Sequence, residues 1–155
     1  MMPQRHLQDF QTIARKKETD MTIPRYVLVV EDEAILGLQL EDALLDAGVE
    51  KVEICSTTEA ALASLKRSQP DVIVLDVHLA DRDDGWAIAE LVRELGPDSP
   101  QIVFSTGQPE DIPQDIAELG YVLQKPYDPE VLVDLLSKPK KRGVISRIKG
   151  ALRDA

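Results

Sequence analysis

Short apolar runs rich in β-branched residues alternate with segments of helical spacing through the middle of the chain. The runs predict five strands, at 25–30, 51–56, 71–76, 101–105 and 121–124. Apolar residues three or four positions apart predict helices from Leu36 to Gly48, from Ser56 to a residue before Pro70, from Trp86 to Gly96, over 110–119 and after Asp128. Strands apolar on both faces that alternate with helices indicate a parallel sheet covered on both sides. We therefore expect a doubly wound α/β fold of the flavodoxin type, with strand order 2-1-3-4-5.

Local sequence signals mark where two of these helices begin. Ser56 and Glu59 have the spacing of a capping box, in which the serine hydroxyl and the glutamate each satisfy a free backbone amide. Asp128 followed by Pro129 is typical of an N-cap and a first helical residue.

The two ends of the chain differ from this central part. Residues 1–23 are polar and lack strong periodicity, so we expect a flexible leader before one domain at 24–137. Residues 138–155 begin as a Lys/Pro-rich linker and predict an amphipathic helix with Val144, Ile145, Ile148, Ala151 and Leu152 on one face. No stretch reaches the ~18 apolar residues of a membrane span, and no apolar signal segment opens the chain. We therefore expect a cytoplasmic location.

Charge is distributed unevenly along the chain, whose net charge is −10. Residues 24–137 hold 24 Asp/Glu against 7 Lys/Arg, whereas residues 138–155 hold 7 Lys/Arg against a single Asp. The acidic domain would repel nucleic acid, so direct binding to nucleic acid is not expected. For the basic tail, docking on its own domain, contact with a membrane and contact with a partner stay as alternatives. The lone Cys55 excludes an internal disulfide and fits a buried apolar position.

Polar residues gather where the predicted strands end. Glu31 and Asp32 follow the first strand, Asp76 ends the third, Thr106 follows the fourth and Lys125 follows the fifth. Because the carboxyl ends of parallel strands meet at one edge of a sheet, these side chains are expected to lie together.

The residue types at this edge suit phosphoryl chemistry. Asp32 and Asp76 could bind Mg²⁺ directly, with Glu31 acting through water, because hard cations prefer carboxylate oxygens. Asp76 could attack a phosphoryl group, while Thr106 donates a hydrogen bond to it and Lys125 supplies positive charge. Some of these residues could instead have purely structural roles. Acids at a helix start are favoured by the helix dipole, which is the preferred reading for Glu33 in the first turn, and Thr106 could cap the next helix.

Four strings of this sequence resemble, in order and spacing, the motifs of the two-component response-regulator receiver domain: "VVEDE", "VLDVHLADRDDG", "FSTG" and "LQKPY". The resemblance covers residues 24–137. It implies that Asp76 accepts phosphate from a histidine kinase, that Thr106 and Lys125 bind the phosphoryl group, and that a cis peptide precedes Pro126. It further implies an Mg²⁺ site formed by Glu31, Asp32, Asp76 and the backbone carbonyl of His78.

The sequence departs from the common receiver pattern at several positions. Val122 stands where many receivers carry an aromatic switch residue, and Tyr121 is one position away. Ala80 replaces a frequent proline, and Gly85 comes one residue later than is usual. The strings "FSTG" and "YVLQKPY" resemble the alphaproteobacterial FATGUY subgroup, whose members lack that aromatic and often pair with HWE or related histidine kinases.

These features predict a single-domain response regulator that signals through phosphorylation-dependent protein–protein interaction. Its partners would be a sensor histidine kinase and a phosphotransfer protein or another regulator, and homodimerisation is left open. Residues 138–155 are too few for a DNA-binding module with its own core. We expect no enzymatic activity beyond self-phosphorylation and self-dephosphorylation. One alternative is an Mg²⁺-dependent phosphatase with an aspartate nucleophile, although His78 occupies the position of that family's second aspartate. The other is an adaptor that acts mainly through its tail.

Overall fold

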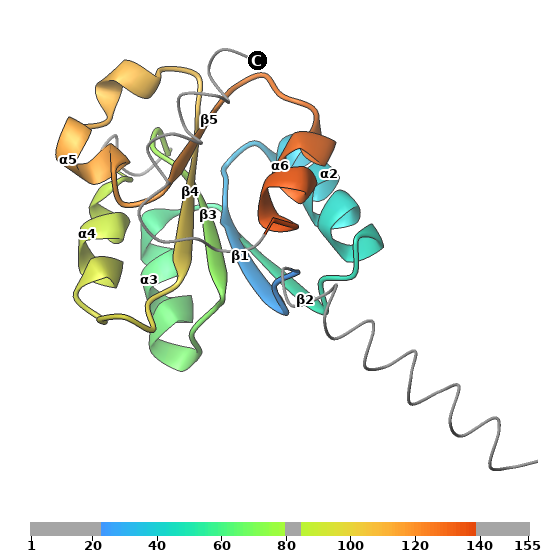
Figure 1. Cartoon of the computed structure of the whole chain (residues 1–155), viewed down its shortest axis with the longest axis horizontal. Coiled ribbons are helices and arrows are strands. Elements are labelled where there is room, and N and C mark those ends of the chain that lie inside the picture. Colours follow the sequence, from blue (N-terminus) through green and yellow to red (C-terminus); the bar gives the residue numbers. More distant parts are fainter. Residues whose placement is uncertain (1–22, 80–84, 139–155) are drawn as a thin grey trace, which may run out of the picture.

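The computed structural model describes residues 23–79 and 85–138, which form a five-stranded parallel sheet with helices on both faces (Figure 1). The strands are β1 (Tyr26–Val30), β2 (Lys51–Cys55), β3 (Val72–Asp76), β4 (Gln101–Thr106) and β5 (Tyr121–Gln124). Their order is β2-β1-β3-β4-β5, as the sequence predicted. In register, Val30 pairs with Leu75 and Asp76 pairs with Ser105, so the strands end at one edge.

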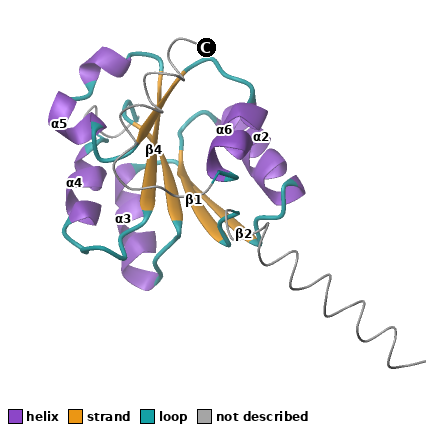
Figure 2. Ribbon diagram, in the orientation of Figure 1, coloured by secondary structure: helices purple, strands orange, loops and turns teal. Residues whose placement is uncertain are grey.

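Helices cover the two faces of the sheet unequally (Figures 1 and 2). The helical elements are α2 (Ala34–Asp46), α3 (Thr58–Arg67), α4 (Ala87–Arg93), the 3₁₀ helix η1 (Pro109–Asp111), α5 (Gln114–Ala117) and α6 (Pro129–Leu136). Helices α2 and α6 pack together on one face, where Leu40 and Leu132 are buried in the same cluster. Helices α3, α4 and α5 lie on the other face, over Leu28 and Phe104.

The strands supply both halves of the core by alternation. In β1, Val27 and Val29 face α2 and α6, whereas Leu28 faces the opposite layer. All five residues of β3 are buried because this strand lies at the centre of the sheet. The resulting framework holds the strand ends in fixed positions, which sets the geometry of the polar residues there.

Two local predictions were wrong, each for a backbone reason. The helix predicted over 110–119 is divided into η1 and α5 by Ile112, which is extended with φ −83° and ψ 124°. Ile112 precedes Pro113, and the residue before a proline is disfavoured in the helical region. Helix α3 is capped by Thr57, whose side chain accepts a hydrogen bond from the Ala60 amide, one residue later than the capping box predicted.

The predicted cap of α6 is confirmed, since the Asp128 carboxylate accepts from the Glu130 amide at 3.0 Å. Residues 1–22 of the predicted leader and residues 139–155 of the predicted tail lie outside the described residues, and so does Ala80 in the loop after β3. Within residues 23–79 and 85–138, no helix is both long enough and apolar enough to cross a membrane.

Candidate functional site

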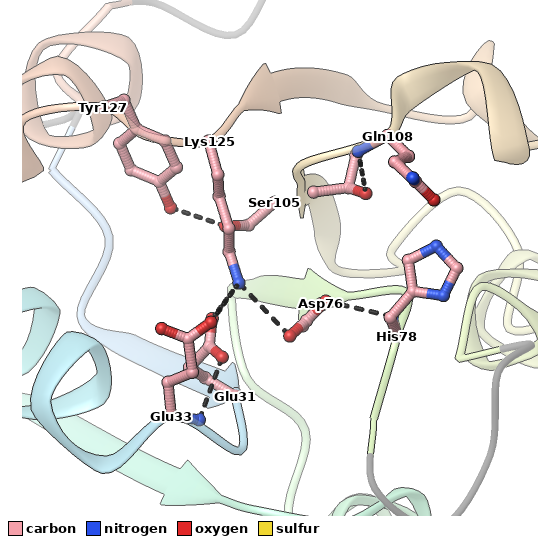
Figure 3. Close-up of polar contacts among 9 residues, drawn as sticks. Glu31, Glu33, Asp76, His78, Ser105, Gln108, Lys125 and Tyr127 are labelled. Carbon is pink, nitrogen blue, oxygen red and sulfur yellow. Dashed lines mark hydrogen bonds and ion pairs between the residues drawn. The ribbon is translucent and has the colours of Figure 1, made fainter.

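The polar cluster lies at the carboxyl edge of the sheet, and residues from β1, β3 and β5 meet there (Figure 3). Glu31 follows β1, Asp76 is the last residue of β3 and Lys125 follows β5. The Lys125 amide donates to the Thr106 carbonyl oxygen at 2.8 Å, which extends the β4–β5 pairing by one residue. The Lys125–Pro126 peptide bond is cis, as expected from the sequence.

Lys125 joins the two buried carboxylates of this cluster. Its Nζ lies 2.8 Å from Glu31 Oε1 and 3.2 Å from Asp76 Oδ2. Glu33 is a more distant partner, with its Oε1 at 3.9 Å from the same nitrogen. Only 16% of the Lys125 side chain is exposed, so the ammonium is held at the site by its charge partners as well as by packing.

Burial and charge act against each other at this cluster. Burial raises the pKa of Glu31 to about 7, although hydrogen bonds from Lys125 and from the Glu33 amide act in the opposite direction. Burial lowers the pKa of Lys125, but contacts with Glu31 and Asp76 outweigh it and raise that pKa above its ordinary value. The ammonium therefore stays charged, while an additional positive charge near Glu31 would favour its ionised form.

Three carboxylates are arranged closely enough to bind one cation. One oxygen each from Glu31, Asp32 and Asp76 lies within 4.8 Å of the others. Glu31 and Asp76 are buried, whereas Asp32 is exposed at the rim. Oxygen donors of this kind suit Mg²⁺, so the donor set fits the metal that the sequence predicted.

Asp76 is oriented by contacts on both carboxylate oxygens. Oδ1 accepts from the His78 amide at 3.0 Å, and Oδ2 contacts Lys125. The His78 ring points away from Asp76 (Figure 3), and its Nε2 lies 3.0 Å from Asp111 Oδ2. The histidine side chain is thus engaged with the 3₁₀ helix rather than with the carboxylate cluster.

Thr106 ends β4 beside the acidic cluster and is fully buried. Its Oγ1 accepts from the Gln108 amide at 3.0 Å, an arrangement that closes the turn after the strand. The N-cap of η1 is Gln108, so the alternative of Thr106 as a helix cap is wrong. Because its oxygen serves as the acceptor in that bond, the hydroxyl hydrogen can still be donated to a bound group.

Sequence reasoning missed the hydrogen bond between Ser105 Oγ and Tyr127 Oη, which measures 2.7 Å. Burial is the main reason why the pKa of Tyr127 is raised. The position of Tyr127 two residues after Lys125 in "KPY" was the only available signal. This bond connects β4 to the segment before α6, on the side of the sheet that carries α2.

Glu33 differs from the two acids before it. It is the N-cap residue of α2 and not part of the first turn, and its side chain makes no capping hydrogen bond. Its amide donates to Glu31 Oε2 at 3.1 Å. The consecutive acids therefore separate into a buried Glu31, a rim Asp32 and a helix-start Glu33.

Comparison with known proteins identifies this arrangement. Residues 27–137 match the model of the response regulator receiver domain. The chain belongs to this family. It is 36% identical over 119 residues to the sensory transduction protein LytT of Bacillus cereus, covering 75% of this chain and 47% of LytT. It is 28% identical over 117 residues to the chemotaxis protein CheY of Thermotoga maritima, covering 74% of this chain and 97% of CheY.

A solved structure shows the same receiver fold. The chemotaxis response regulator CheY4 of Vibrio cholerae superposes with a TM-score of 0.61 at 28% identity, covering 72% of this chain and 94% of CheY4.

The chain spans about half the length of several curated relatives that it matches, such as LytT at 47% and the transcriptional regulatory protein PdtaR of Mycobacterium tuberculosis at 54%. It carries a receiver of two-component signal transduction. Membership of the FATGUY subgroup stays a prediction.

Proposed function

We propose that this receiver accepts a phosphoryl group from a histidine kinase on Asp76 and signals through phosphorylation-dependent contacts with other proteins. The observation that carries the proposal is the contact of Asp76 Oδ2 with Lys125 Nζ at 3.2 Å, beside a cluster of carboxylates that fits Mg²⁺. A carboxylate at a strand end, paired with a fixed cation, can act as a nucleophile while the cation stabilises negative charge on transferring oxygens.

The transfer step requires little from the protein beyond placement. A carboxylate oxygen of Asp76 forms a bond to phosphorus as the bond from phosphorus to the kinase imidazole nitrogen breaks. The electron pair of the broken bond stays on that nitrogen. Lys125 lies close enough to bind an oxygen of the transferred group, and the Thr106 hydroxyl has a hydrogen to donate.

The metal in this proposal is Mg²⁺, bound by the carboxylates of Glu31, Asp32 and Asp76 and by the backbone carbonyl of His78. When bound, Mg²⁺ supplies positive charge that stabilises the oxygens of the phosphoryl group. The raised pKa of Glu31 supports this assignment, because a buried carboxylate with a poorly compensated charge favours a further cation.

An open cavity of about 890 Å³ provides access to Asp76. Its lining includes apolar Ile35 and Leu36 of α2, together with Pro126 and Tyr127 after β5. Such a mouth could admit the imidazole of a kinase or phosphotransfer protein. We further propose that the protein acts in the cytoplasm and makes no direct contact with nucleic acid. The kinase is predicted to be of the HWE or a related type.

The phosphatase alternative requires a general acid two positions after the nucleophile, where this chain has His78. The ring of His78 is engaged by Asp111 at 3.0 Å, which disfavours it as a freely placed acid. We therefore propose no enzymatic turnover beyond the protein's own phosphorylation and dephosphorylation.

The test uses a small phosphodonor with Mg²⁺ and intact-mass measurement. The unaltered chain should gain one phosphoryl group that hydroxylamine removes, as expected for an acyl phosphate. Asp76→Asn should gain none, whereas Asp98→Asn, at an exposed position on the opposite edge of the sheet, should label normally. Equal labelling of Asp76→Asn and the unaltered chain would overturn the assignment of the acceptor.

A further inference from the structure

Helix α2 has an apolar surface on its outer side in addition to its buried inner side. Ile35 is 74% exposed, Leu38 59% and Leu45 46%, and their spacing places all three on one side of the helix. We call these three residues the α2 stripe. Leu40 and Leu44 already fill the inner side against the sheet and α6. An exposed row of large apolar side chains on one helix is the kind of surface that interaction sites display.

Acidic residues lie within and beside the α2 stripe, since Asp42 falls between Leu38 and Leu45 on the same side of the helix. Glu41, Asp42 and Asp46 lie in the same helix, which contains no basic residue. Asp42 and Asp46 are exposed. A segment that covers this surface should therefore combine an apolar face with positive charge.

We propose that residues 139–155 of this chain dock on the α2 stripe as an amphipathic helix. This segment contains six Lys/Arg and one Asp. Its apolar positions, Val144, Ile145, Ile148, Ala151 and Leu152, share one helical face. It thus offers both properties that the α2 stripe requires.

The distances along the chain allow this docking. Helix α6 packs beside α2, and Lys138 after it borders a cavity with Ile23 and Pro100 at the amino edge of the sheet. Helix α2 ends at that same edge, since the Glu50 amide donates to the Arg25 carbonyl oxygen just before β1. The extended linker 139–143 spans up to about 17 Å, whereas neighbouring helix axes lie about 8–10 Å apart. A helix over 144–155 would be about 18 Å long, close to the roughly 20 Å of α2.

Charge disfavours two other occupants of the α2 stripe. A second copy using the same surface would bring Asp42 and Asp46 near their counterparts, and like charges repel. An anionic membrane would meet the same acidic border and the acidic domain behind it. The basic segment 139–155 has the complementary sign and is present at high effective concentration because it is covalently attached.

The docked segment would run antiparallel to α2, with its start near Leu45 and its later residues near Ile35. Ile35 also lines the cavity above Asp76. The docking itself requires no phosphorylation, so it can be tested separately.

The test places a nitroxide on Gly150→Cys in the full chain and measures amide signals by nuclear magnetic resonance. Gly150 lies off the apolar face, and Cys55 is buried, so labelling is directed to the new thiol. Amides of Leu38 and Leu45 should lose signal through their proximity to the label. Amides of Leu91 and Leu95, which are exposed in or next to α4 across the sheet, should keep theirs.

Matched variants decide the outcome. Ile148→Asp should restore the α2 signals, whereas Ser146→Asp, with the same added charge off the apolar face, should leave them weakened. The proposal is overturned if α2 keeps full signal, if both variants act alike, or if α4 loses as much signal as α2. It is also overturned if signal loss appears only when nitroxide-labelled and isotope-labelled copies are mixed, or only with anionic lipid vesicles, because those results assign the contact to a second copy or to a membrane.

Discussion

A Cβ atom on Gly85 would lie 2.7 Å from the backbone carbonyl oxygen of Asp76. The Gly85 amide also donates to the Val77 carbonyl oxygen at 3.1 Å, so the chain returns directly against the end of β3. Real Cβ atoms essentially never come that close to a carbonyl oxygen, and the atoms that this Cβ would meet belong to the backbone of Asp76 and Val77 and not to a flexible side chain. Gly85 is thus required by the close packing around the candidate phosphoryl acceptor.

Replacing Gly85 with alanine should therefore lower the free energy of unfolding by about 1–3 kcal/mol, the usual range for forced overpacking. Gly107→Ala is the matched control, since a Cβ there has no atom within 4 Å. Urea denaturation of both variants measures the difference. Equal stability of the two would show that the segment around Gly85 shifts without cost.

The acidic residues after β1 should differ in their contribution to Mg²⁺ binding. Asp32→Asn should weaken binding, because its carboxylate lies in the cluster with Asp76. Glu33→Gln should change it little, since Glu33 is the N-cap residue of α2 and lies outside that cluster. Isothermal titration calorimetry of the two variants checks this division. A larger loss in Glu33→Gln than in Asp32→Asn would reverse the assignment of the metal ligands.

The order of the strands and the meeting of Asp76 with Lys125 could be predicted from the sequence. Parallel strands place their carboxyl ends together, so the sequence alone predicts that each polar residue after an apolar run lies at the same edge. The same reasoning placed Glu31 and Asp32 beside them, and their shared position is confirmed.

Details that depend on side-chain direction could not be predicted in this way. The contact of His78 with Asp111 and that of Ser105 with Tyr127 join residues 33 and 22 positions apart. Spacing in sequence carries no information about such pairs. The cap of α3 at Thr57 was missed because neighbouring Ser56 and Thr57 both carry a hydroxyl, and only the packed helix selects one of them.

The hydrogen bond between Ser105 and Tyr127 should stabilise the protein measurably. Ser105 is buried, so Tyr127→Phe would leave the Ser105 hydroxyl without this partner. The variant should lower the free energy of unfolding by about 1–2 kcal/mol. The double variant Ser105→Ala/Tyr127→Phe should lose less free energy of unfolding than the two single variants lose together. The difference, the coupling energy of the pair, should be about 1 kcal/mol. Denaturation of all four proteins supplies the cycle. Strict additivity would mean that the bond contributes nothing to stability.

A second polar cluster, centred on Glu53 in β2, should make stability depend on pH. Glu53 Oε1 accepts from Tyr26 Oη at 2.7 Å and from Ser64 Oγ at 2.8 Å, while Oε2 contacts Arg67 at 3.2 Å. The hydrogen bond from Tyr26 is the main reason why the pKa of Glu53 is lower than its ordinary value. The unfolded chain therefore binds this proton more readily than the folded protein does.

It follows that the stabilisation from Glu53 is fully present above the unfolded pKa of 4.5 and is lost as pH falls through the lower folded value. Glu53→Gln should cost roughly 1 kcal/mol at neutral pH, a modest figure because the side chain is 26% exposed to screening solvent. The difference from the unaltered protein should shrink as pH falls below 4.5. Glu94→Gln, at an exposed glutamate directly after α4, serves as the control in thermal unfolding over this range. A difference between Glu53→Gln and the unaltered chain that stays constant with pH would show that the cluster contributes by packing and not by charge.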